Sequence, residues 1–145
     1  MIEARLPEVN MAGFHGLLFI SGLLGLIFIA LSGEVVRLRV VKHVLIGDGA
    51  GQEGMEALRD AVRAHANFAE YVPLILLLLA ADSYAGAAAR WVVWPGAVLV
   101  LARLAHAVGM RLPAPNPLRG GGAVLTWAVL LLASAEALYL ACQAS

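Results

Sequence analysis

Residues 63–81, RAHANFAEYVPLILLLLAA, join a polar first part to a continuous apolar run that suits lipid or a protein core. Arg63, His65, Asn67 and Glu70 occupy its first two turns, where charge is costly if the helix enters a bilayer. Ionisable residues in membrane helices nearly always face a bundle interior or a cavity. The stretch therefore predicts a membrane helix whose first turns look into a polar site.

The composition of the chain is that of an integral membrane protein. Of its 145 residues 61% are hydrophobic and 14% are charged, and the mean hydropathy is +0.84. A soluble domain carries about 45–50% apolar and about 25% charged residues. The net charge of zero gives no support for a nucleic-acid partner. Cys142 is the only cysteine, which excludes a disulfide within the chain, and we expect no metal site.

Four stretches are long and apolar enough to span a bilayer, which takes about 20 residues in a helix. They cover approximately residues 11–36, 55–82, 90–110 and 119–142. The spans are too long and continuous for the strands of a small barrel. The sequence thus predicts one all-α domain over residues 1–145, an integral membrane four-helix bundle with short loops.

The distribution of Lys and Arg predicts the orientation in the membrane, because these residues are more frequent in cytoplasmic loops. Five of them lie beside the first and third loops: Arg37, Arg39, Lys42, Arg111 and Arg119. The other side has Arg5 and Arg90. We therefore expect the first and third loops in the cytoplasm and both termini outside, in a multi-pass protein of the cell or inner membrane if the source is bacterial.

A polar stripe runs along the second expected helix. At about 100° per residue, Arg59, Arg63 and Glu70 fall within about 40° of one another, and Asn67 lies about 40° beyond Arg63. The third helix carries Arg103 and, three residues later, His106.

Glu70 and Arg103 are expected at similar depth, so an ion pair between them is predicted. Such a pair could fix helix docking or serve a ligand, and the two interpretations stay equally open. The excess of arginines near the cytoplasmic mouth favours a ligand with carboxylates, since guanidinium binds carboxylate through two parallel hydrogen bonds. Glu70 would then meet an amine of the ligand.

The remaining motifs do not indicate a nucleotide-binding or catalytic site. Residues 49–54, GAGQEG, match G-x-G-x-x-G, but no strand or βαβ unit surrounds them, so they indicate a flexible loop. No Ser–His–Asp arrangement or carboxylate pair suggests nucleophilic or acid–base catalysis. Any reaction would use a bound cosubstrate that the protein activates electrostatically.

Several of these segments resemble the MAPEG family, the membrane-associated proteins in eicosanoid and glutathione metabolism. The family includes microsomal glutathione transferases, leukotriene C synthase and microsomal prostaglandin E synthase. RAHANFAEYVPL, residues 63–74, looks like its most specific signature. Weaker similarities follow in the family's order and spacing, in EVVRLR at 34–39, ARLAHAVG at 102–109 and PLRGG at 117–121.

The resemblance implies a homotrimer that binds glutathione between neighbouring subunits, in a site open to the cytoplasm. Family roles in holding glutathione fall on Arg37, Arg63, Asn67, Glu70, Tyr71 and His106. Arg119 would lie near the sulfur and favour the thiolate, which makes it the candidate catalytic residue. A small lipophilic electrophile or hydroperoxide would enter from the lipid bilayer.

Two positions and one short segment depart from the family pattern. Met110 stands where a tyrosine is frequent, Ala66 replaces a further arginine of the prostaglandin synthase, and residues 120–123 lack its serine and tyrosine. These changes weigh against the eicosanoid activities. The leading hypothesis is a membrane glutathione transferase, with or without peroxidase activity. The alternatives are a scaffold or lipid-binding trimer of the same fold and, third, a small transporter.

Overall fold

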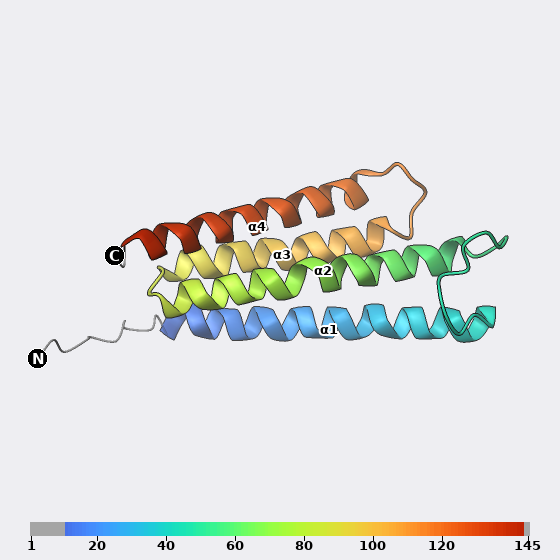
Figure 1. The fold of residues 1–145 in the computed structure, drawn as a ribbon, viewed down its shortest axis with the longest axis horizontal. Helices are drawn as coiled ribbons and strands as arrows, with labels where there is room; N and C mark the ends of the chain where they lie inside the picture. Colours follow the sequence, from blue (N-terminus) through green and yellow to red (C-terminus); the bar gives the residue numbers. More distant parts are fainter. Residues whose placement is uncertain (1–10, 144–145) are drawn as a thin grey trace, which may run out of the picture.

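The computed structural model describes residues 11–143, which form four long helices and their connections (Figure 1). The helices are α1 (Met11–Lys42), α2 (Glu56–Tyr84), α3 (Ala89–Gly109) and α4 (Pro117–Gln143). Each is long and apolar enough to cross a membrane. The predicted all-α membrane four-helix bundle is confirmed, while the homotrimer stays a prediction for this single chain.

The helices run side by side along the long axis of the molecule (Figure 1). The loops 43–55 and 110–116 lie at one end, which we name the loop end. The turn 85–88 lies at the opposite end, the turn end, where α1 begins and α4 ends. Within residues 11–143, α1 packs on α2 and α3, and α4 packs on α3 and α2. Segments 63–70 and 103–119, which carry most candidate site residues, therefore meet at the loop end.

The end of α1 is fixed by a left-handed residue and by a side chain. His43 has a φ of 55°, and the amide of Val44 bonds back to the carbonyl of Arg39 at 3.0 Å, the pattern that commonly closes a helix. The Arg39 guanidinium also donates to the carbonyl of Gly47 at 3.3 Å. Arg39 thus holds the start of the loop, and α1 extends beyond the expected end at Val36.

The bundle has a narrow apolar core and an apolar outer surface. Leu24, Ile75, Leu79 and Leu99 are almost completely buried between the helices. Many other large apolar side chains, such as Phe19, point outward and are exposed. An apolar outer surface is what lipid tails require, so burial within the chain accounts for only part of its hydrophobicity.

Glycines let α3 and α4 approach closely at the loop end. A Cβ on Gly122 would lie 2.7 Å from the carbonyl oxygen of Ala102 and 2.8 Å from Cβ of His106. A Cβ on Gly109 would lie 2.3 Å from the amide nitrogen of Arg119. Small residues at helix contacts permit such backbone approach in membranes. The contact fixes the first turn of α4 against the last turns of α3.

Candidate functional site

A polar pocket of about 350 Å³ lies at the loop end, where α2 faces the end of α3 and the start of α4. Its lining consists of Arg63, Ala66, Asn67, Glu70, His106, Met110 and Arg119. We name it the polar pocket. It brings together most of the residues that the sequence assigns to the site, from three different helices.

The α2 wall of the polar pocket presents charged side chains that are unpaired within the described residues. Arg63 and Glu70 are exposed, and neither makes a hydrogen bond or ion pair with another residue of the described part, 11–143. Arg59 lies on the same stripe but binds the carboxylate of Glu56 at 3.1 Å and does not line the pocket. The available cation and anion of this wall are therefore Arg63 and Glu70.

Arg103 supports the polar pocket from behind rather than pairing with Glu70. Only 2% of Arg103 is exposed. Its Nη1 donates to Oδ1 of Asn67 at 2.5 Å, and its Nη2 donates to the carbonyl of Gly122 at 3.1 Å. The predicted Glu70–Arg103 ion pair is wrong: α3 faces the Asn67 side of the stripe, and Glu70 remains exposed.

This contact also fixes the orientation of the Asn67 amide. A guanidinium only donates hydrogen bonds, so the atom that meets Arg103 is the amide oxygen. The amide NH₂ of Asn67 has no partner within residues 11–143 and remains able to donate to a ligand. Asn67 is thus held as a donor facing the polar pocket.

His106 is buried, with 7% of its surface exposed, and bonds across the α3–α4 contact. Its Nδ1 lies 3.0 Å from the carbonyl oxygen of Arg119. A carbonyl oxygen accepts, so Nδ1 donates, and in a neutral ring Nε2 is then an acceptor. This bond sets the tautomer of a ring that lines the polar pocket.

Asn116, which was not among the predicted site residues, positions Arg119. The Asn116 side-chain oxygen accepts the amide of Arg119 at 3.0 Å, and its nitrogen donates to the carbonyl of Gly109 at 2.9 Å. Pro117 follows as the first helical residue. An asparagine cap followed by proline is a common helix start, so the pair Asn116–Pro117 is a signal that the sequence carries.

Two of the expected residues lie outside the polar pocket. Arg37 forms two 2.8 Å hydrogen bonds, from Nε and Nη2, to the carboxylate of Glu34. Tyr71 packs partly buried against the apolar core. Within one chain, therefore, neither Arg37 nor Tyr71 joins the other candidate residues.

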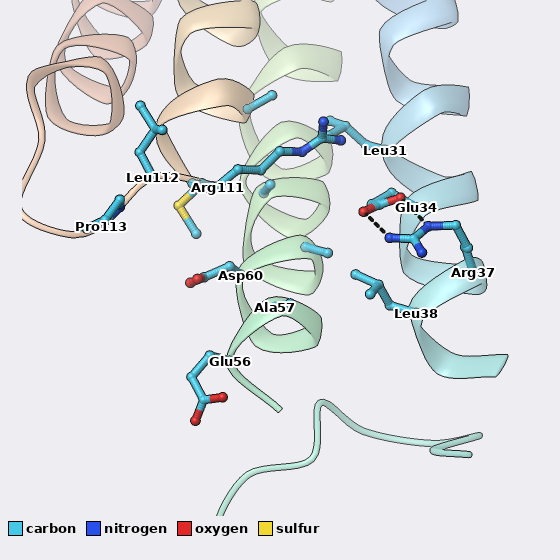
Figure 2. A pocket seen from close by; sticks show the side chains of 14 residues that line it. Leu31, Glu34, Arg37, Leu38, Glu56, Ala57, Asp60, Arg111, Leu112 and Pro113 are labelled. Carbon is cyan, nitrogen blue, oxygen red and sulfur yellow. Dashed lines mark hydrogen bonds and ion pairs between the residues drawn. The ribbon is translucent and has the colours of Figure 1, made fainter. Parts of the chain in front are cut away.

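Arg37 instead lines a second pocket of about 390 Å³ between α1, α2 and the α3–α4 loop, shown in Figure 2. The Glu34–Arg37 pair stands on its α1 side, and the side chain of Arg111 extends across it toward α1. Met110, which is 3% exposed, lines both this pocket and the polar pocket. The two cavities are thus separate but share one flexible apolar side chain.

The polar pocket combines two unpartnered cationic side chains, Arg63 and Arg119, with one carboxylate, one amide donor and one imidazole. Guanidinium groups suit carboxylates, and the carboxylate of Glu70 suits an amine. In residues 11–143 no group of three or more His, Cys, Asp or Glu side chains could hold a metal ion. The arrangement fits a small zwitterionic molecule with an excess of carboxylates.

Comparison with known proteins gives a family and a curated relative. The sequence model of the MAPEG family matches residues 17–139 of this chain. The inner membrane protein YecN of Escherichia coli strain K12 is 36% identical over 107 residues, which are 74% of this chain and 78% of YecN. The YecN of Escherichia coli O6:H1 has the same identity and coverage. No solved structure matches.

Proposed function

Since this chain belongs to the MAPEG family, we propose that it is a multi-pass inner-membrane protein that binds glutathione and transfers its thiolate to a lipophilic electrophile. The observation that carries the proposal is the convergence of Arg63, Asn67, Glu70, His106 and Arg119 on one pocket. The charges of these groups are complementary to those of glutathione, because its carboxylates and its thiolate suit the two arginines and its amine suits Glu70. The name of the relative YecN supports the inner membrane as the location.

In this proposal each polar side chain has one task. Arg63 binds a carboxylate, Glu70 binds the amine, and the NH₂ of Asn67 donates to an oxygen of the peptide. Arg119 lies near the sulfur. The contacts of Arg63, Glu70 and Asn67 hold the tripeptide in both the ground state and the transition state, so these three residues contribute to binding more than to rate.

Arg119 would supply the chemical activation. A free thiol has a pKa near 8.5, and a nearby cation lowers it because the thiolate is stabilised. The thiol proton leaves to solvent at the loop end. The thiolate sulfur then forms a bond to the electrophilic carbon while the leaving group departs with its electron pair.

Arg37 supports an assembly of several copies. Arg37 lines the second cavity on the α1 side and not the polar pocket, so in this proposal it contacts bound glutathione from another subunit. This agrees with the homotrimer and the intersubunit site that the family resemblance implies. We therefore propose that Arg37 acts on the site of a neighbouring copy.

Met110 favours a second candidate function. It offers a thioether where many family members offer a tyrosine hydroxyl, so the polar pocket has one hydrogen-bond donor fewer. The alternative is a scaffold or lipid-binding trimer that binds glutathione without activating it. A transporter has no such specific support.

The experiment combines two measurements on the purified protein in detergent or bilayers. A binding isotherm with glutathione tests the pocket, and conjugation of an aryl halide tests thiolate transfer. Binding with conjugation supports the transferase, and binding without conjugation supports the scaffold. Absence of binding contradicts both. Reduction of a hydroperoxide, with two glutathione molecules forming a disulfide, tests peroxidase activity separately.

A further inference from the structure

A groove of about 400 Å³ lies between α3 and α4; it extends from Arg90, at the turn end, toward the middle of both helices and shares no residue with the polar pocket. It is lined by Arg90, Trp91, Trp94, Pro95 and Val98 of α3 and by Ala128, Val129 and Leu132 of α4. We propose that this groove binds one anionic phospholipid, with its phosphate at Arg90 and one acyl chain between the helices. The proposal is independent of glutathione.

Arg90 supplies the contact for the headgroup. It is exposed at the start of α3, and its guanidinium carbon lies 5.9 Å from the centroid of the Trp91 ring. It makes no hydrogen bond or ion pair with any residue between 11 and 143, and no carboxylate lines the groove. A guanidinium binds phosphate oxygens through parallel hydrogen bonds, so the free donors of Arg90 fit a phosphodiester.

The rest of the groove suits an acyl chain. Trp94 is 70% exposed at its rim, whereas Val129, 4% exposed, forms its floor. Ala128, Leu132 and the other lining residues apart from Arg90 are apolar. From Arg90 to Val98 the helix rises about 12 Å, at about 1.5 Å per residue. Half of a hydrocarbon core of about 30 Å is about 15 Å, so the groove covers most of one leaflet.

The tryptophans fix the depth at which this groove lies. Tryptophan is enriched where membrane meets water, because the ring is apolar and its N–H is polar. Trp91 and Trp94 follow Arg90 directly along α3, so the cation lies at headgroup level and the apolar part lies below it. A lone cation without a neighbouring carboxylate favours an anionic headgroup over a zwitterionic one, whose positive part finds no partner.

Tryptophan quenching by brominated lipids tests the proposal. The chain has three tryptophans, so the variant Trp91→Phe/Trp127→Phe leaves Trp94 as the only reporter. The protein is reconstituted in mixed phosphatidylcholine and phosphatidylglycerol, with one of the two lipids brominated at a time. We expect Trp94 to report an about fivefold higher apparent affinity for phosphatidylglycerol, the factor that corresponds to about 1 kcal/mol from one cation. Arg90→Gln should abolish this preference.

Two controls isolate the groove. Trp127 is exposed on α4 but does not line it, so the variant Trp91→Phe/Trp94→Phe should be quenched equally by the two lipids. Lys42→Gln removes one positive charge at the loop end and should leave the preference at Trp94 unchanged. Equal quenching of Trp94 by both lipids would overturn the proposal. Absence of quenching by either would also overturn it, because the groove would then be covered, for example by a second copy.

Discussion

Arg103 and Asn67 join α3 to α2 through a hydrogen bond of 2.5 Å from Nη1 to Oδ1, directly behind the polar pocket. The buried guanidinium of Arg103 binds the amide oxygen of Asn67 and so leaves the NH₂ of that amide as the donor. It does not pair with the carboxylate of Glu70. Glu70 remains exposed, and it has no hydrogen-bond or ion-pair partner among residues 11–143. The support of the site thus depends on α3 and the carbonyl of Gly122 as much as on the α2 signature.

This relationship predicts coupling between Arg103 and Asn67. Arg103→Met and Asn67→Leu should each destabilise the protein in detergent, and the double variant should lose less than the sum, with a coupling free energy of about 0.5–3 kcal/mol. Denaturant unfolding measures the cycle. Glu70→Gln is the matched control, because an exposed unpaired side chain should change stability by no more than about 0.5 kcal/mol. Additive losses would show that the bond contributes nothing.

Adjacent glycines of α4 should respond differently to alanine. Gly122→Ala would force a Cβ within 2.7 Å of the Ala102 carbonyl oxygen, and overpacking of this kind costs about 1–3 kcal/mol. A Cβ on Gly121 meets nothing within 4 Å, so Gly121→Ala should be neutral or stabilise by up to about 1 kcal/mol through helix propensity. Thermal unfolding compares the two variants. Equal effects would contradict the close α3–α4 approach.

Asp82 is expected to lower stability in the wild-type chain. It is 1% exposed near the end of α2, and neither carboxylate oxygen has a hydrogen-bond partner within the described residues. Burial of an unsatisfied polar group costs about 1–3 kcal/mol, so Asp82→Leu should raise the midpoint of thermal unfolding. Asp60→Leu, at a half-buried position of the same helix, should change it little. A loss on Asp82→Leu would mean that the carboxylate has a partner in the assembled protein.

The orientation predicted from Lys and Arg is tested by cysteine labelling. In a Cys142→Ser background, an impermeant reagent added outside intact cells should label Ala85→Cys at the turn end but not Asp48→Cys at the loop end. Both positions lie in connections between helices. The opposite pattern would place the polar pocket on the outer side of the membrane, away from the cytoplasm, and would contradict the proposed use of cytoplasmic glutathione.

The fold class was predictable from the sequence because each membrane helix can be recognised from its own residues. Length and apolarity identify each span without reference to its neighbours. The polar stripe on α2 was also predictable, since the spacing of Arg63, Asn67 and Glu70 fixes their common face within one helix.

Contacts between different helices were harder to predict from the sequence. Whether Arg103 meets Glu70 or Asn67 depends on the rotation and crossing of α3 against α2, which the spacing within one helix does not determine. The role of Gly122 likewise depends on the approach of two backbones. Asn116 is different, because its cap is a local signal that precedes Pro117 and could have been read from the sequence.

Arg119 separates binding from chemistry in the proposed mechanism. Its backbone is fixed by Asn116 and His106, while its side chain has no partner in the described chain and lines the polar pocket. Arg119→Leu should lower turnover and shift the pH–rate profile upward, because without the cation the thiol pKa returns toward its ordinary value of about 8.5. Glutathione binding should change little. Asn67→Ala should mainly weaken binding. A variant Arg119→Leu with wild-type turnover would make His106 the next residue to test.

The most direct test of the central claim is an absorbance titration of the glutathione thiolate with wild-type protein at neutral pH, beside a binding isotherm. The account predicts that thiolate absorbance rises in proportion to bound glutathione and saturates at the same concentration. It also predicts that the rise is lost in Arg119→Leu while the isotherm is nearly unchanged. Saturable binding of glutathione by the wild type without any thiolate signal would contradict the transferase and leave the scaffold in its place.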